Sequence, residues 1–377
     1  MSAIYKKLEE VCEILDSRRV PITAKNRKTG IYPYYGANGL QDYVAEYIFD
    51  DELVLLAEDG GNFGSKERPI AYRVSGKCWV NNHAHVLKAK PLVNADYLCY
   101  ALMFYDTEGL VNGATRQKLT QTAMRQMMIP YRNMTEQLQI ADEINQVIRL
   151  IDKRKEELSL LDQLVKSRFI EMFGDPEKNP FGWDMSTIGV LISSCEAGWS
   201  GNGSQREKKD GEIAVLKVSA VTKGYFIPDE CKVLDDQSNI KKYVFPQEGD
   251  LLFSRANTRE MVGATAVITQ NYPEYILPDK LWRIRFVDAT NVWYMKYILS
   301  SKSIRAIFAS VSTGTSGSMF NVSMEKFKSI AVPLPPLELQ EQFAVFVTQT
   351  DKSKLAVEKS LKQLEILKKS LMQQYFG

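Results

Sequence analysis

The sequence predicts an α+β protein in which a mixed α/β segment followed by a long helix occurs twice. Residues 129–174 align with residues 332–377 without a gap, at a constant shift of 203 positions. Both stretches have the apolar spacing of an amphipathic helix, whereas the segment before each shows the shorter patterns of strands and helices mixed. Because a repeated frame is the mark of a duplicated architecture, the predicted order is segment, helix, segment, helix.

Identical residues recur through the aligned stretches and, more faintly, before them. At shifts of 199 and 197 positions the likeness extends into the α/β segments. The drift in the shift indicates loop insertions within one retained scaffold. The identical pairs include Pro130 and Pro333, Gln137 and Gln340, Ala141 and Ala344, Lys166 and Lys369, Phe173 and Phe376, Asp51 and Asp250, and Tyr97 and Tyr294.

Short apolar runs predict strands in both segments, and an amphipathic run predicts one helix in each. The predicted strands span 53–57, 79–88, 250–254 and 281–286, and the predicted helices span 96–104 and 292–300. Because the two segments share a scaffold but differ in their loops, we expect them to perform the same kind of task on different targets.

Two long helices are predicted because neither proline nor glycine occurs within 135–173 or 338–376. Each would be about 60 Å long at about 1.5 Å per residue. An amphipathic helix of this length cannot bury its apolar stripe alone, so we expect the two to bury each other. The residues expected to pair are Ile144, Ile151, Leu158, Leu161, Val165, Val347, Val357, Leu361, Leu364 and Leu371. The predicted domains span 1–133, 134–175, 176–336 and 337–377, and the second and fourth of these are the helices.

Composition places few limits on function. With 377 residues the chain has room for two or three domains, and 45% apolar and 25% charged residues are typical of a globular protein. The net charge of +2 gives no overall attraction to nucleic acid, so any DNA-binding face must come from local arrangement. Five scattered cysteines without a CxxC motif argue against disulfides and zinc sites. A charged N-terminus and the lack of a long apolar run favour a cytoplasmic protein without a membrane span.

Several loops combine glycine with polar side chains. Glycine lets a backbone approach a partner closely, and Arg, Lys, Asn and Gln donate hydrogen bonds to bases and phosphates. The same composition also describes an ordinary surface turn, so DNA contact and a plain turn both stay open. The candidate DNA-contacting residues are Tyr34, Tyr35, Asn38, Asn62, Lys66, Arg116, Gln117 and Lys118 in the first segment, and Asn202, Arg255, Asn257, Arg259, Ser316, Ser318 and Asn321 in the second.

Catalytic motifs are weak or incomplete. The run Asn179-Pro180-Phe181 invites comparison with a methyltransferase motif, but it lacks the second proline and a glycine-rich cofactor loop before it, so a turn is favoured. Pro278-Asp279-Lys280 beside Glu274 lacks the further carboxylates of a nuclease and is interpreted as a turn with strand-edge charge. We therefore expect no cofactor and no catalytic residue, and the absence of a Walker motif assigns any ATP-driven step to a partner.

The two histidines, His83 and His85, are two residues apart, so they are predicted to share one strand face. Such a pair could bind a metal ion, but the sequence offers no evident third ligand. A position against a polar neighbour, or one facing DNA, is therefore favoured over a metal site.

The joints around the helices carry a family resemblance. The second helix is entered through 330–342 (IAVPLPPLELQEQ), and the first is left through 173–183 (FGDPEKNPFGW). Together with 32–36 (YPYYG), 249–253 (GDLLF) and 316–318 (SGS), this ordered set resembles the specificity subunit of a type I restriction–modification system over essentially the whole chain. One departure is 131–134 (YRNM), where the family usually has a proline-rich entry.

The resemblance implies that each α/β segment is a target-recognition domain that inserts loops into DNA grooves and reads one half of a bipartite, asymmetric site. It implies that the long helices pair antiparallel as a coiled-coil spacer between the half-sites, with pseudo-two-fold symmetry. The implied partners are double-stranded DNA, two copies of a modification (methyltransferase) subunit, and restriction (endonuclease and translocase) subunits.

Two other functions compete with DNA reading. The chain could be a stand-alone DNA-modifying enzyme, or a coiled-coil adaptor that does not bind DNA. The missing cofactor and metal motifs argue against the enzyme. Non-identical loop sets on a shared scaffold argue against the adaptor, which has no need of them.

Overall fold

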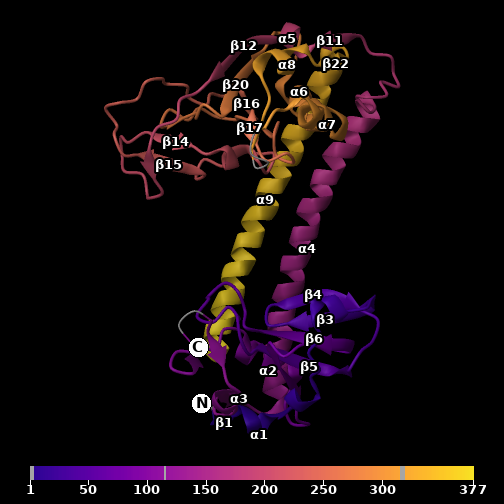
Figure 1. Cartoon of the computed structure of the whole chain (residues 1–377), viewed down its shortest axis with the longest axis vertical. Coiled ribbons are helices and arrows are strands. Elements are labelled where there is room, and N and C mark those ends of the chain that lie inside the picture. Colours follow the sequence, from indigo (N-terminus) through magenta and orange to yellow (C-terminus); the bar gives the residue numbers. More distant parts are fainter. Residues whose placement is uncertain (1–3, 114–115, 315–318) are drawn as a thin grey trace. The chain divides into compact units, whose positions relative to one another are not determined.

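The computed structural model describes residues 4–113, 116–314 and 319–377, and the chain divides into two compact units (Figure 1). Unit 1 consists of Met1–Lys155 with Lys359–Gly377, and unit 2 of Glu156–Glu358. Helices α4 (Met134–Phe173) and α9 (Leu337–Phe376) each contribute one stretch to each unit, and both long helices predicted from the sequence are confirmed. Among the described residues, no helix combines the length and the apolar character needed to cross a membrane.

Unit 1 is built on a six-stranded sheet with the strand order β2-β7-β5-β6-β3-β4. Successive residues of its central strand β5 point to opposite faces. Val54 and Leu56 pack in the cluster that contains helix α2, and Leu53 and Leu55 pack in the cluster on the other face. The elements are β1 (Ile4–Lys7), α1 (Leu8–Val11), β2 (Cys12–Ile14), β3 (Thr29–Gly36), β4 (Gly39–Val44), β5 (Phe49–Ala57), β6 (Ala71–Val80), β7 (Ala84–Ala89), α2 (Ala95–Met103), β8 (Val111–Asn112), β9 (Lys118–Leu119), α3 (Gln121–Arg125) and β10 (Met128–Tyr131).

Unit 2 contains two four-stranded sheets, with the orders β12-β20-β16-β18 and β13-β15-β14-β19. The central strand β16 shows the same alternation, because Leu251 and Phe253 pack with the helices while Leu252 packs on the other face. The elements are β11 (Met185–Thr187), α5 (Ile188–Leu191), β12 (Ile192–Ala197), β13 (Gly203–Ser204), β14 (Ala214–Leu216), β15 (Cys231–Leu234), β16 (Leu251–Ser254), β17 (Ala256–Asn257), β18 (Thr265–Val267), β19 (Tyr275–Ile276), β20 (Leu281–Phe286), α6 (Val292–Ser300), α7 (Lys302–Val311), β21 (Phe320–Asn321), α8 (Met324–Ser329) and β22 (Ala331–Pro333).

A buried glutamine forms the same joint in both units, near the start of each long helix. In unit 1 the side chain of Gln137 accepts a hydrogen bond from the backbone N–H of Asn94 at 2.8 Å, just before α2. In unit 2 Gln340 accepts one from the N–H of Asn291 at 2.8 Å, just before α6. Both glutamines are fully buried, where an unpaired amide would be costly. In each unit, the glutamine therefore fixes the start of a domain helix, α2 in unit 1 and α6 in unit 2, against the long helix.

Within each unit, the beginning of one long helix lies beside the end of the other, so the two stretches run antiparallel. In unit 1 the hydroxyl of Tyr375 on α9 donates to Glu143 on α4 at 2.6 Å. In unit 2 the ammonium of Lys354 on α9 lies 2.6 Å from Asp162 on α4. Of the ten residues expected to pair the helices, five are buried and five are half-buried. The buried ones are Ile144, Ile151, Val165, Val347 and Val357, and the half-buried ones are Leu158, Leu161, Leu361, Leu364 and Leu371.

Candidate nucleic-acid interface

Polar segments far apart in the sequence of unit 1 meet around Gly60. The Asn38 side chain donates to the Gly60 carbonyl at 3.0 Å and accepts from the Asn62 side chain at 3.1 Å. The Gly60 N–H donates to the Gln117 carbonyl at 3.2 Å. Gly60 itself has a φ of +62°, a left-handed conformation that favours glycine. We call this group of loops, residues 37–38, 58–66, 82–83 and 116–118, the unit 1 loop cluster.

Two exposed cations of the unit 1 loop cluster are held by carboxylates at their bases. The Arg116 guanidinium donates to Asp59 at 2.7 Å, and the Lys118 ammonium lies 3.0 Å from Glu58. The side chains of Arg116 and Lys118 are nevertheless 60% and 50% exposed, whereas those of the two carboxylates are 18% and 13% exposed. The two cations therefore face solvent, and the carboxylates that pair with them are less exposed. Lys66 is also an exposed cation of this cluster.

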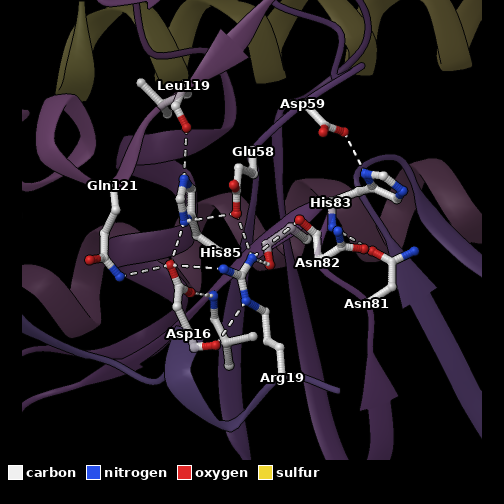
Figure 2. A network of polar contacts seen from close by, with 12 residues as sticks. Asp16, Arg19, Glu58, Asp59, Asn81, Asn82, His83, His85, Leu119 and Gln121 are labelled. Carbon is white, nitrogen blue, oxygen red and sulfur yellow. Dashed lines mark hydrogen bonds and ion pairs between the residues drawn. The ribbon is translucent and has the colours of Figure 1, made fainter. Parts of the chain in front are cut away.

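A buried charged network lies directly beneath these loops (Figure 2). His85, which is 1% exposed, has one ring nitrogen 2.6 Å from Asp16 and the other 2.9 Å from the Leu119 carbonyl. The Arg19 guanidinium donates to Glu58 at 2.6 Å and lies 3.5 Å from Asp16. The network joins a turn after β2, the end of β5, the strand β7 and the strand β9. It therefore fixes the bases of the loops that carry the exposed cations.

The carboxyl groups of this network have lowered pKa values. Burial would raise the pKa of Asp16, but the hydrogen bond and charge of His85 and the N–H of Val86 lower it below its ordinary value. Burial would likewise raise the pKa of Glu58, but hydrogen bonds from Arg19 and Lys118 lower it. The ionised forms are thus favoured in the folded chain.

Because both pKa values are lowered on folding, these groups stabilise unit 1 above the pKa of the unfolded carboxyls, near 4, and this contribution is lost as the pH falls further. We expect Asp16→Asn to destabilise unit 1 by about 2 kcal/mol at pH 7. The difference in the free energy of unfolding between this variant and the wild type should become smaller below about pH 4. Hydrogen exchange of unit 1 peptides in urea at several pH values measures this, and a difference that stays constant down to pH 3 would contradict it.

The geometry around His85 does not fit a metal site. Ligand atoms of Asp16, Glu58 and His85 lie within 4.8 Å of one another, so the structure supplies the further ligands that the sequence did not reveal. However, the carboxylate oxygens already accept hydrogen bonds from Arg19, from Gln121 and from a backbone N–H. A cation would have to displace the guanidinium, which is 2.6 Å from Glu58. The arrangement is that of a charge-balanced hydrogen-bond network.

The prediction that the two histidines share a strand face is wrong. His83 lies in the turn before β7 and places one ring nitrogen 2.6 Å from Asp59, whereas His85 lies within β7 and is buried. A turn at Asn82 and His83 separates two strands, so the predicted strand 79–88 is in fact the end of β6 and most of β7. His83 therefore belongs to the loop cluster and His85 to the network beneath it.

Tyr34 is a correction to the candidate DNA contacts. The stretch 32–36 is not a loop but part of strand β3, which forms a hairpin with β4. Tyr34 is 1% exposed, and its hydroxyl donates to the Ile22 carbonyl at 3.3 Å, so it is a core residue. Tyr35 is half-buried, with its ring centroid 6.0 Å from that of Tyr72. Among the candidates of this stretch, Asn38 at the turn is the one that joins the loop cluster.

In unit 2, three candidate residues lie on or directly beside a small two-stranded sheet. Strands β17 and β21 pair Asn257 with Phe320 and Ala256 with Asn321, and the carbonyl of Arg255 accepts a hydrogen bond from the next residue, Val322, at 2.9 Å. Arg255, Asn257 and Asn321 are all half-buried. We call residues 255–259 with 320–321 the unit 2 loop cluster.

An aspartate also holds the arginine of the unit 2 loop cluster. The Arg255 guanidinium donates to the Asp279 carbonyl at 2.8 Å and lies 3.7 Å from its carboxylate, which also accepts a hydrogen bond from Ser200. The interpretation of Pro278-Asp279-Lys280 as a turn beside a strand is confirmed, since β20 begins at Leu281. In each unit, an aspartate therefore holds an arginine of the loop cluster.

Of the remaining candidates of unit 2, one belongs to the unit 2 loop cluster, and the others lie apart from it or outside the described residues. Arg259 is exposed, with its guanidinium 5.8 Å from the ring centroid of Phe320. Asn202 is exposed beside Asp235 rather than beside Arg255. Ser316 and Ser318 lie outside the described residues. Asn179, in the motif that resembles a methyltransferase signature, forms the predicted turn with a φ of +39°. Its side-chain amide donates a hydrogen bond to the Trp183 carbonyl and accepts one from the Trp183 backbone N–H.

Sequence comparison identifies the family. The family of the type I restriction modification DNA specificity domain matches residues 4–160 and 180–366. The chain is also 26% identical over 386 aligned positions to S.HindORF215P of Haemophilus influenzae, a predicted type I restriction enzyme specificity subunit, and the alignment covers 98% of this chain and 94% of that protein.

Solved structures share the fold. The S subunit of a type I restriction–modification system from M. genitalium has a TM-score of 0.60 and 13% identity, with 100% of this chain and 96% of that chain covered. A chain from a study of complex assembly and conformational transition of the type I R-M system has a TM-score of 0.54 and 16% identity, with 99% and 97% covered. The chain therefore belongs to the family of type I restriction–modification DNA specificity subunits.

Proposed function

We propose that the two loop clusters read the two halves of a bipartite DNA site in double-stranded DNA. One observation carries the proposal: each unit gathers polar side chains from distant segments around an arginine that an aspartate holds, Arg116 by Asp59 and Arg255 by Asp279. An arginine fixed at one edge can donate from its other nitrogens to base acceptors in the major groove. Because the remaining residues of the two clusters differ, the two half-sites should differ, and the whole site should be asymmetric.

We further propose that α4 and α9 form an antiparallel coiled-coil spacer that sets the interval between the half-sites. Three features support this: the 40 residues of each helix, the antiparallel contacts of their stretches within each unit, and the burial of apolar positions along both. The matching glutamine joints and domain helices support a pseudo-two-fold repeat, which corresponds to the predicted domains 1–133, 134–175, 176–336 and 337–377. Such a repeat suits two copies of one partner.

The partners we propose are two modification (methyltransferase) subunits, one beside each half-site, and restriction subunits that supply cleavage and translocation. The chain itself would be non-catalytic and would act in the cytoplasm, where its DNA lies. This division of labour is supported by the family to which the chain belongs.

Alanine variants of the two held arginines test the proposal. We expect Arg116→Ala to lose about 1–3 kcal/mol of base discrimination in one half-site, and Arg255→Ala to lose a similar amount in the other half-site only. The complex with the modification subunits would be titrated with duplexes that carry single substitutions at a fixed salt concentration. Arg206→Ala is a matched control, since Arg206 is 40% exposed and pairs with Glu212 away from the cluster. Unchanged preferences in both variants, or loss of both half-sites in each, would contradict the proposal.

A further inference from the structure

The contacts of Asp59 suggest that it acts through Arg116. A single carboxylate oxygen of Asp59 accepts from the Arg116 guanidinium at 2.7 Å and from the His83 ring at 2.6 Å. His83 is in turn fixed by its backbone, because its N–H donates to the Asn81 side chain at 2.8 Å and its carbonyl accepts from the Glu58 N–H at 2.8 Å (Figure 2). The carboxylate therefore has a defined position before any ligand arrives.

Arg116 is held at one corner only. One of its terminal nitrogens bonds to Asp59 and lies 3.4 Å from Nδ1 of His83, and within residues 4–113, 116–314 and 319–377 its other two nitrogens have no hydrogen-bond acceptor. Its side chain is 60% exposed, whereas that of Asp59 is 18% exposed. A guanidinium has five N–H donors in a rigid plane, so fixing one corner orients the rest. The donors of the other two nitrogens are therefore available to a ligand.

We propose that Asp59 is a positioning residue that presents the free edge of the Arg116 guanidinium to guanine in the major groove. This inference rests on the proposed function and adds to it the base that one arginine reads. Guanine is assigned because its N7 and O6 are adjacent acceptors that match two parallel guanidinium donors, a pattern that no other base offers in that groove. Asp59 itself would not touch DNA, since its carboxylate lies below the arginine and would be repelled by phosphates.

The proposal predicts opposite effects on specificity and on non-specific affinity. In Asp59→Asn the arginine remains but loses its charged anchor, so its orientation becomes less defined. We expect the preference for guanine at one position to fall about tenfold, whereas Arg116→Ala should abolish that preference. Because a negative charge near the phosphates is removed, affinity for an unrelated duplex should hold or rise. A purely structural role of Asp59 would lower both affinities together.

The test uses the full chain in complex with its modification subunits. The preferred duplex is first selected from a random library, and affinities are then measured for duplexes that differ at single positions. Asp51→Asn is the matched control: Asp51 lies near the other end of β5, its side chain is 23% exposed, and its carboxylate is 2.6 Å from the Lys88 ammonium. This control removes the same charge and an ion pair of similar geometry, and it should leave every base preference unchanged.

The outcomes separate the inference from the function on which it rests. A wild-type complex without any sequence preference would overturn the proposed function. A wild type that prefers guanine at a position sensitive to Arg116→Ala, with the same preference weakened in Asp59→Asn and kept in Asp51→Asn, supports the inference. A position sensitive to Arg116→Ala but unchanged in Asp59→Asn would overturn the role of Asp59. A base other than guanine at that position would overturn the assignment of the base.

Discussion

Replacing Asp250 by alanine should destabilise unit 2 by about 3 kcal/mol, the largest loss we expect from a single substitution. Asp250 lies directly before β16, beside β20, and is fully buried. One carboxylate oxygen accepts from the Arg285 guanidinium at 2.7 Å, and the other accepts from the backbone N–H of Gln247 at 2.7 Å. Arg283 adds a second cation, 3.9 Å away, because residues two apart on β20 share one face.

The loss comes mainly from what alanine leaves behind. The Gln247 N–H would lose its acceptor, and Arg283, whose side chain is 14% exposed, would lose part of its counter-charge in a site that water reaches poorly. Arg285 is 42% exposed and can be hydrated again when the carboxylate is removed. We therefore expect a loss of stability at the lower end of the range for a broken buried ion pair.

Urea unfolding followed by tryptophan fluorescence measures this loss, because four of the five tryptophans, at positions 183, 199, 282 and 293, lie in unit 2. Asp288→Ala is the control, since it removes an exposed aspartate from the same unit and should change stability by less than about 0.5 kcal/mol. If both variants unfolded at the same urea concentration, the account of the buried network would be wrong.

The sequence predicted the elements whose patterns are long or strictly local. The helices α4 and α9 were predicted because about 40 residues without a breaker leave no other regular structure. The strand over 281–286 and the helix over 292–300 have the predicted bounds. The predicted strand 79–88 is wrong because its apolar residues belong to two strands, and the turn between them, at Asn82 and His83, has no glycine or proline to mark it.

The candidate site was less accessible to sequence reasoning, because its contacts join residues far apart in the chain. Arg116 and Asp59 are 57 positions apart, and His85 and Asp16 are 69 apart. The exposed polar residues could be named, but the aspartates that hold them carry no motif. Tyrosines beside glycine are typical of a binding loop, which is why the sequence favours a DNA contact for Tyr34, whereas here the tyrosines alternate between the two faces of a hairpin.

Removing one heptad from both long helices should have the largest effect on function. The contacts of Glu143 with Tyr375 and of Asp162 with Lys354 define the register of the stretches. On the proposed pairing, residues 152–158 of α4 lie opposite residues 359–365 of α9. Deleting both segments keeps the apolar stripes in phase, since seven residues are close to two helical turns. Each helix becomes about 10 Å shorter, which corresponds to about three base pairs.

The central claim, that two dissimilar readers are kept at a set interval, is tested most directly by measuring the preferred gap between the half-sites. The complex formed by the doubly shortened chain is titrated with duplexes that keep both half-sites and vary the gap one base pair at a time. A chain of natural length with Lys155→Ala and Glu156→Ala is the control, because both side chains are exposed and lie within the deleted segment of α4. We predict a gap shorter by about three base pairs with both half-site sequences unchanged. The same gap in the shortened and natural-length chains would contradict the account.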